Sequence, residues 1–204
     1  QNAPDYAMMV NYDAEFIKPL ANQLAQIARE NHFDEKETAE MVVTMIQNIT
    51  YTLVHSASHE VAEEQARQAS STFVEEYHID NNHQPFDKSP FGGCEANVDP
   101  IGVYSPIEFL SGLKGDCDTR TVTLFALLKA LNLDAIVVNG PGHSMLAVPY
   151  KPNNPTCPYL IYKGQYYYFW ETTIFYNQNG VSGPRIGDIL DPNFNSTQWT
   201  PVLF

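Results

Sequence analysis

The sequence predicts one α+β domain, in which a helical N-terminal half packs on an antiparallel sheet formed by the C-terminal half. Apolar residues recur at helical spacing over 13–31 and again after Asp34. A further run, starting near residue 117, is apolar on most sides and is therefore expected to be a buried central helix. Short runs of β-branched and aromatic residues follow from residue 135 onward. The 204 residues are enough for one ordinary core.

The two N-terminal helices differ in how their starts are marked. The first is predicted over 13–31, with Pro19 close to its start, where proline is tolerated. Its apolar stripe consists of Phe16, Leu20, Leu24, Ile27 and Ala28. The second begins at Asp34, three residues before Glu37, which is the spacing of a capping box. Both helices are amphipathic, so we expect them to pack together.

The middle of the chain is predicted to hold an exposed helix, a long loop and two more helices. The exposed helix covers 56–77, and the loop covers 79–104, where proline and glycine break any periodicity. A loop of this length is often functional, so we expect it to wall a cleft. Ser105 then caps a helix that ends near Gly112, and the buried helix begins around Cys117.

Four strands are predicted after the buried helix, and a Lys-Gly-Gln turn at 163–165 joins the last two. They cover 135–139, 144–150, 159–162 and 166–173. No internal repeat or linker divides the chain. We therefore expect a single domain over 1–204, with 1–39 as an N-terminal helical extension.

Composition excludes several classes of function. Lys and Arg number 11 against 24 Asp and Glu, a formal net charge of -13, which would repel a nucleic acid. Every apolar run falls short of the roughly 20 residues of a membrane span. The chain begins with Gln1 rather than Met, which leads us to expect a mature, extracytoplasmic protein whose targeting segment is missing.

The cysteines and histidines outside the apolar helix allow less specific interpretations. Three cysteines fit one reactive thiol plus either a disulfide between Cys94 and Cys157 or two inert thiols. His55 and His59 have the spacing of half a metal site, but no glutamate directly follows the first. A solvated helix face is the better interpretation, so no metal and no cofactor are predicted.

Cys117 is placed where a thiol gains most from its surroundings. The free N–H groups and the dipole at a helix N-terminus stabilise a thiolate, and Gly115 permits close approach. Asp116 and Asp118 act in the opposite direction, because nearby negative charge raises a thiol pKa. An imidazolium partner is therefore required.

His143 and Glu171 complete a candidate catalytic set with Cys117. His143 follows a Pro-Gly pair at the start of a predicted strand, which faces the preceding helix. Glu171 lies on a neighbouring aromatic strand, where its carboxylate can accept the second ring N–H and fix the tautomer. The predicted site is a triad of nucleophile, base and orienting acid.

Several segments resemble the transglutaminase-like superfamily, in particular a bacterial and archaeal branch of it. The Gly-Asp-Cys-Asp-Thr-Arg segment at 115–120, followed by a leucine-rich helix, resembles the signature around the family's nucleophile. Pro-Gly-His at 141–143 and the strand ending in Glu-Thr-Thr at 171–173 resemble its histidine and acid strands. Similar segments near 46–51, 104–108 and 185–189 extend the resemblance over about 40–190, the family-like core.

The resemblance implies a papain-like fold and acyl transfer through a thioester. The family usually has aspartate as third member, whereas Glu171 is one methylene longer, with Asp188 as a weaker substitute. Water as second nucleophile makes a peptidase or amidase acting on a peptide or protein, which we favour. An amine makes a protein transglutaminase, and a domain of this fold that binds peptide or cell wall without turnover is the third reading.

One side chain is expected to join the Cys117 N–H in binding the oxyanion. The candidates are Gln47, Gln84, Tyr104 and Trp170. Gln84 lies in the predicted cleft loop and Tyr104 near a helix start, so these two are preferred. Local packing is an equal alternative for both.

Overall fold

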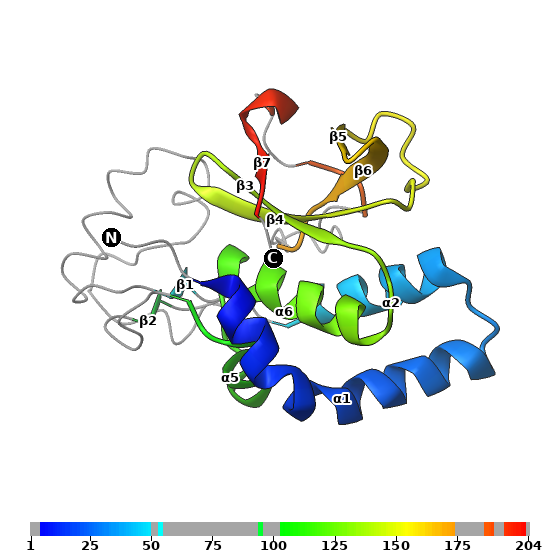
Figure 1. The fold of residues 1–204 in the computed structure, drawn as a ribbon, viewed down its shortest axis with the longest axis vertical. Coiled ribbons are helices and arrows are strands. Elements are labelled where there is room, and N and C mark those ends of the chain that lie inside the picture. The colour runs from blue at the N-terminus through cyan, green and yellow to red at the C-terminus, as the bar shows by residue number, and fades with distance from the viewer. Residues whose placement is uncertain are drawn as a thin grey trace, which may run out of the picture.

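The computed structural model describes residues 5–49, 53–54, 94–95, 103–173, 186–189 and 194–202. Over these residues, helices form one layer and a five-stranded antiparallel sheet forms the other (Figure 1). The predicted α+β class is confirmed. The predicted exposed helix over 56–77, almost all of the loop over 79–104, Gln84 and the two histidines at 55 and 59 lie outside the described residues.

Helix α1 (Tyr6–Glu30) begins seven residues earlier than the predicted start at 13, so that expectation is wrong. The Asp5 carboxylate caps it by accepting from the Met8 N–H at 2.9 Å. Pro19 consequently lies inside the helix, not near its start. An interior proline costs about 3 kcal/mol, and the buried face of α1 offsets that cost.

The buried face of α1 is also rotated from the predicted stripe. Phe16 and Ile27, expected in the core, are exposed. The buried residues are Tyr6, Met9, Val10, Asp13, Ile17, Ala21, Leu24 and Ala28. Within this face the Asp13 carboxylate accepts from the Ile107 N–H at 2.8 Å, so α1 caps the start of helix α5 (Pro106–Gly112).

The predicted starts of the next two helices are confirmed. Helix α2 (Glu35–Gln47) has the full capping box between Asp34 and Glu37. At the start of α5, the Glu108 carboxylate accepts from the Ser105 N–H at 2.8 Å. In each capping box the two partner residues are only three positions apart, which explains why the sequence pattern alone locates these helix starts.

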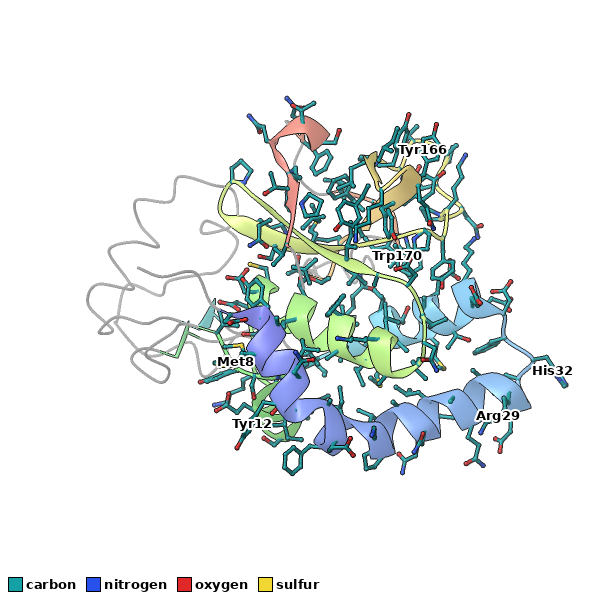
Figure 2. All side chains as sticks on the ribbon, viewed as in Figure 1. Met8, Tyr12, Arg29, His32, Tyr166 and Trp170 are labelled. Atoms are coloured by element: carbon teal, nitrogen blue, oxygen red, sulfur yellow. The ribbon has the colours of Figure 1, made fainter. Side chains whose placement is uncertain are left out.

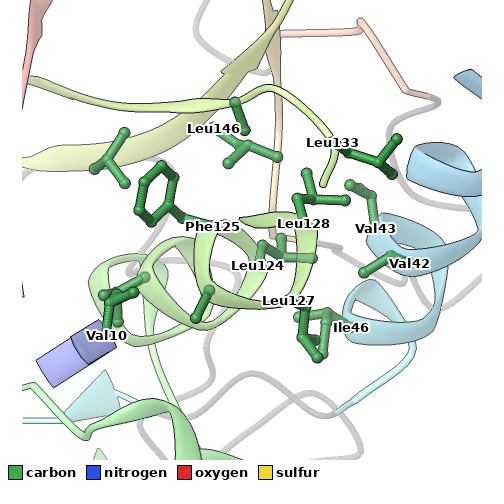
Figure 3. Close-up of a cluster of buried hydrophobic side chains, with 14 of the residues drawn as sticks. Val10, Val42, Val43, Ile46, Leu124, Phe125, Leu127, Leu128, Leu133 and Leu146 are labelled. Atoms are coloured by element: carbon green, nitrogen blue, oxygen red, sulfur yellow. The ribbon is translucent and has the colours of Figure 1, made fainter. Parts of the chain in front are cut away.

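Helix α6 (Cys117–Ala130) is the buried central helix that the sequence predicts. Figure 3 shows its leucines between α2 on one side and the sheet on the other. Leu124, Leu127 and Leu128 are fully buried. Because every side of α6 meets another element, its sequence has no polar stripe.

The sheet has the strand order β5-β6-β4-β3-β7, with all neighbours antiparallel. The strands are β3 (Ile136–Gly140), β4 (His143–Val148), β5 (Tyr159–Tyr162), β6 (Gln165–Trp170) and β7 (Thr200–Pro201). The first four match the predicted runs to within a few residues. At the β5–β6 turn, Lys163 and Gly164 have φ of 49° and 81°, as a tight hairpin turn requires.

Strand β7 was not predicted, because two residues carry no periodic pattern. A further two-residue pair, β1 (Leu53–Val54) with β2 (Cys94–Glu95), is parallel. None of the helices in the described part of the chain is both long and apolar enough to cross a membrane.

Candidate active site

Cys117 is the first residue of α6, at the helix N-terminus that the sequence predicts. The preceding Asp116 caps this helix, because its carboxylate accepts from the Thr119 N–H at 3.3 Å. Gly115 is required for the approach: a Cβ there would lie 2.5 Å from the Thr119 Cγ2 and 2.7 Å from the Phe109 ring. Glycine therefore lets the chain enter α6 tightly against α5.

The fully buried side chain of Arg120 anchors this entry to α2. Its Nε donates to the Gly115 carbonyl at 3.0 Å, and its terminal nitrogens donate to the Ile46 and Ile49 carbonyls. Those two carbonyls lie at the C-terminal end of α2, where the helix dipole favours a cation. Sequence reasoning placed Arg120 in a motif but did not find this role, since the partners are about 70 residues away.

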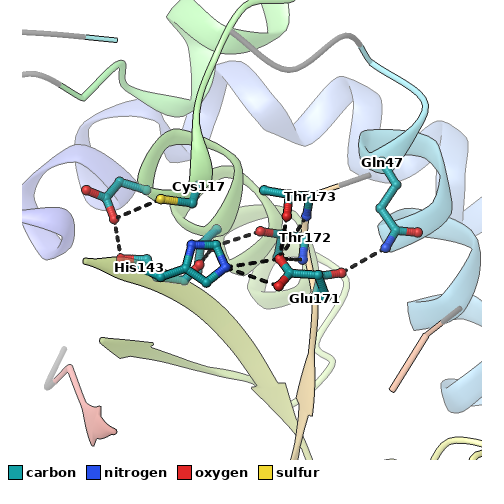
Figure 4. A network of polar contacts seen from close by, with 9 residues as sticks. Gln47, Cys117, His143, Glu171, Thr172 and Thr173 are labelled. Carbon is teal, nitrogen blue, oxygen red and sulfur yellow. Dashed lines mark hydrogen bonds and ion pairs between the residues drawn. The ribbon is translucent and has the colours of Figure 1, made fainter. Parts of the chain in front are cut away.

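His143 and Glu171 meet in the structure as predicted. The His143 Nε2 lies 3.2 and 3.1 Å from the two carboxylate oxygens of Glu171. Figure 4 shows the imidazole between this carboxylate and the Cys117 sulfur, so the other ring nitrogen, Nδ1, is left for the thiol. The structure thus brings the three predicted residues into one line.

The Glu171 carboxylate is held by neighbours besides His143. Its Oε1 accepts from the Thr172 N–H at 2.9 Å, the Thr173 N–H at 3.0 Å and the Thr173 hydroxyl at 2.8 Å. The Gln47 amide of α2 donates to the Glu171 backbone carbonyl at 2.8 Å. Because both its carboxylate and its backbone carbonyl are hydrogen-bonded, Glu171 has a fixed orientation toward the imidazole although it is longer than aspartate.

Charge and burial shift the pKa values of all three groups. Burial alone would raise the pKa of Glu171, but charge and hydrogen bonding from His143, with hydrogen bonds from Thr173, lower it. Burial alone would lower the pKa of His143, yet Glu171 and Cys117 raise it well above its ordinary value. The site is therefore built to hold a proton on the imidazole.

The thiol has the opposite problem. Burial raises the pKa of Cys117, and the charges of Asp118 and Asp116 raise it further. Of the main influences on the pKa of Cys117, only His143 lowers it, through its charge and a hydrogen bond. The thiolate thus depends on the imidazolium.

Polar contacts between three elements keep the site assembled. The Ser144 hydroxyl donates to the Asp118 carboxylate, which links β4 to α6. The Thr121 hydroxyl donates to the Ser144 carbonyl at 3.2 Å and lies 3.2 Å from the Thr172 hydroxyl beyond β6. Each of the three catalytic candidates immediately precedes, in sequence, a residue that makes one of these contacts.

The oxyanion candidates have different surroundings. The backbone N–H of half-buried Tyr104 donates to the Thr119 hydroxyl at 3.1 Å, which places Tyr104 beside the first turn of α6. The Gln47 amide is engaged with Glu171. Trp170 is fully buried, and its Nε1 has no hydrogen-bond partner among the described residues.

Trp199 is a site neighbour that sequence reasoning missed. Its ring meets the His143 ring edge-on, with centroids 6.0 Å apart and an interplanar angle of 84°. A Cβ at Gly140 would lie 2.5 Å from the Trp199 ring, so this glycine makes room for it. A single tryptophan in a C-terminal segment without periodicity gives no signal of such a contact.

The remaining candidates lie away from the line of three residues. Asp188, the weaker substitute for Glu171, accepts from the Asn154 amide at 2.9 Å. Cys157 is free and buried, so it does not form the disulfide with Cys94. Burial raises the pKa of Cys157 to about 11, which fits the inert-thiol interpretation.

Comparisons with known proteins identify no relative: no family model, no curated protein and no solved structure matches this chain.

Proposed function

We propose that this chain is a cysteine-dependent acyl-transfer enzyme with a papain-like, transglutaminase-like fold, acting as a peptidase or amidase on peptide or protein amides. The observation that carries the proposal is the line from the Cys117 thiol through His143 to Glu171, whose carboxylate lies 3.1 Å from the imidazole. A buried carboxylate bonded to an imidazole can hold that imidazole in one tautomer and orientation, which is the role we propose for Glu171. The resemblance of the segments around all three residues points the same way.

In the proposed reaction, the Cys117 thiolate adds to an amide carbonyl and forms a tetrahedral oxyanion. The backbone N–H of Cys117 has no acceptor within α6, because Cys117 is the first residue of that helix, and it is suited to donate to that oxyanion. His143, protonated at the ring nitrogen that faces the sulfur, gives its proton to the departing amine, and a thioester remains.

Water completes the cycle. The now neutral His143 takes a proton from water, which attacks the thioester, and the products are a carboxylic acid and the free thiol. Glu171 stays ionised throughout, because its lowered pKa lies far from neutrality, and it stabilises the imidazolium in both halves. An amine in place of water would give transamidation.

The test is to incubate the protein with a glutamine-rich acceptor protein and a fluorescent primary amine. Hydrolysis releases ammonia or new peptide N-termini without incorporating the amine, whereas transfer incorporates it. We expect the first outcome, and we expect Cys117→Ala to abolish it. Cys157→Ala is the matched control, because it removes a thiol that lies away from His143.

Three results separate the alternatives. Amine incorporation that requires Cys117 would show that the protein is a transglutaminase and not a hydrolase. Binding of peptide or cell-wall fragments with no turnover, together with a Cys117 that reacts with iodoacetamide like an ordinary thiol, would contradict catalysis. Turnover that survives in Cys117→Ala would rule out this site.

A further inference from the structure

The residues that directly follow the three members of the candidate triad belong to one network of hydrogen bonds. They are Asp118 after Cys117, Ser144 after His143 and Thr172 after Glu171. The Ser144 hydroxyl donates to the Asp118 carboxylate. The Thr121 hydroxyl of α6 donates to the Ser144 carbonyl at 3.2 Å and lies 3.2 Å from the Thr172 hydroxyl (Figure 4). The network therefore joins the three segments of the triad directly beside the reactive groups.

The hydroxyl groups of this network are buried. Ser144 is 2% exposed, and Thr121 and Thr172 are fully buried. Other polar side chains, such as Arg29 at the end of α1 and His32 just after it, lie on the outside of the molecule (Figure 2). A buried hydroxyl is costly unless it is hydrogen-bonded. The buried hydroxyls therefore favour the one arrangement of α6 and the sheet in which their partners are within reach.

The bond between Asp118 and Ser144 lies beside the thiol. The Asp118 Oδ1 that accepts from Ser144 is 4.0 Å from the Cys117 sulfur. Asp118 belongs to the first turn of α6, and Ser144 is the second residue of β4. The Ser144 hydroxyl also lies 2.8 Å from the Oδ1 of Asn139, its partner in β3. The start of α6 is thus joined to the sheet at the point where the nucleophile and the base meet.

We propose that Asp118 and Ser144 are positioning residues, whose hydrogen bond sets the separation between the Cys117 thiol and the His143 imidazole. Each partner in this bond is one residue along the chain from the group that it positions, and consecutive Cα atoms are about 3.8 Å apart. A bond between residues 118 and 144 therefore limits how far residues 117 and 143 can part. This inference rests on the proposed function, in which the thiol and the imidazole must stay in contact.

The Asp118 carboxylate has two opposite effects on the thiol. As the acceptor for Ser144, it keeps the imidazole of His143 close to the sulfur, which stabilises a thiolate. As a negative charge near the sulfur, it raises the pKa of Cys117. Asparagine separates the two effects, because its amide oxygen still accepts from a hydroxyl but carries no charge. Alanine removes both.

Other ionisable groups around the thiol come from several elements. They are Asp116 on α6, His143 on β4, Glu171 beyond β6 and Tyr6 on α1. Asp116 raises the pKa of Cys117, and His143 lowers it. Burial raises the pKa of Tyr6 far above its usual value, so this phenol stays neutral while the thiol titrates. A looser thiol–imidazole contact therefore raises the pKa of Cys117, because it weakens the support that the imidazolium gives.

The first experiment compares Asp118→Ala with Asp118→Asn, which have the same charge and differ in the acceptor for Ser144. The rate of Cys117 alkylation by iodoacetamide is measured from pH 5 to 10, with peptide mapping to separate Cys117 from the other thiols. We expect the midpoint for Asp118→Asn to lie below that of the wild type. The midpoint for Asp118→Ala should lie about 0.5 unit or more above that of Asp118→Asn.

The second experiment removes the donor of the same bond. Ser144→Ala should raise the midpoint by about 0.5 unit or more, with a rate at pH 7 about 3-fold lower than in the wild type. Its turnover number should fall about 10-fold, with a smaller change in the Michaelis constant. Ser111→Ala, which removes a hydroxyl at an exposed position of α5, is the matched control and should equal the wild type.

A double variant tests whether the two residues act through one bond. Ser144→Ala should cause no further shift in the Asp118→Ala background, because the bond is already lost there. Equal midpoints for Asp118→Ala and Asp118→Asn, a Ser144→Ala profile that superimposes on the wild type, or a full shift in the double variant would overturn the inference. The two single comparisons address opposite ends of the bond, so either one decides the question if a variant of the other does not fold.

The two proposals fail separately. If the wild type shows no turnover but the midpoints of Asp118→Ala and Asp118→Asn differ as expected, only the proposed function is lost. If turnover depends on Cys117 and these midpoints coincide, only the positioning role of Asp118 and Ser144 is lost.

Discussion

Glu171 illustrates how one residue is defined by its partners. Its carboxylate accepts from His143, from two backbone N–H groups and from the Thr173 hydroxyl. A buried carboxylate with this many donors stays ionised at low pH. The extra methylene relative to aspartate is accommodated because Glu171 lies just beyond the end of β6, where the chain leaves the sheet.

Glu171→Gln should reduce turnover by about 100-fold or more, since the imidazolium then loses its buried counter-charge. The Michaelis constant should change much less, because the side chain is 3% exposed and lies behind the imidazole. Steady-state kinetics measure both quantities. Thr156→Ala, a change at an exposed residue of the loop before β5, is the control and should leave both unchanged. An equal loss with Thr156→Ala would indicate a general defect.

Glu171→Gln should also lower the free energy of unfolding by an amount that depends on pH. The lowered pKa of Glu171 contributes stability above its unfolded pKa of about 4.3, and this is lost as pH falls through the folded pKa. The raised pKa of His143 contributes stability below its unfolded pKa of about 6.5, and this is lost as pH rises through the folded pKa. The gap between wild type and Glu171→Gln should therefore be widest between about pH 4.3 and 6.5.

Denaturant unfolding at several pH values measures that gap, which we expect to reach about 1–3 kcal/mol. Both proteins should carry Cys117→Ala, so that the thiol does not titrate with the imidazole. A gap that stays constant from pH 4 to pH 9 would contradict the coupled pair.

At the scale of elements, contacts between helices determine where α1 starts and which of its faces is buried, whereas local capping residues determine the starts of α2 and α5. The capping boxes of α2 and α5 are local, and the sequence located both. The start of α1 at Tyr6 was missed, because its buried face is selected by packing on α5 and α6. The same packing tolerates Pro19 in the helix interior.

Asp13→Ala should lower the free energy of unfolding by about 1–3 kcal/mol. The substitution leaves the Ile107 N–H at the start of α5 without the carboxylate that now accepts from it in a buried position. Asp13→Asn is the matched control, since its amide oxygen can still accept, and it should cost less. Denaturant titration of the three proteins checks the order, and an Asp13→Asn protein as unstable as Asp13→Ala would contradict the capping role.

At the scale of the whole molecule, the helical layer and the sheet share one core. Leu146 of β4 is fully buried and pairs with Val137 of β3 and Trp170 of β6. It faces the central helix α6, as Figure 3 shows. The strand that begins with His143 is therefore also the strand that holds the two layers together.

Leu146→Ala should destabilise the protein by about 2–5 kcal/mol, because it removes buried methyl groups and leaves a cavity between the layers. Ile161→Ala, at an exposed position of β5, should change the unfolding free energy by about 0.5 kcal/mol or less. Thermal or denaturant unfolding measures both. Similar costs for the two substitutions would show that the layers do not share a core.

The sequence by itself determined the α+β class, the four main strands, two capped helix starts and the identity of the three residues in the candidate triad. These features follow from local patterns: periodicity, capping residues, turn residues and a helix start with glycine before a cysteine. The tertiary structure alone decided the distance from His143 to Glu171, the anchoring of Gly115 by Arg120 and the contact of Trp199 with His143. It also decided that α1 begins at Tyr6 and packs against α6. Each of these joins elements far apart in the chain, and no pattern within a single segment encodes which distant surface that segment will meet.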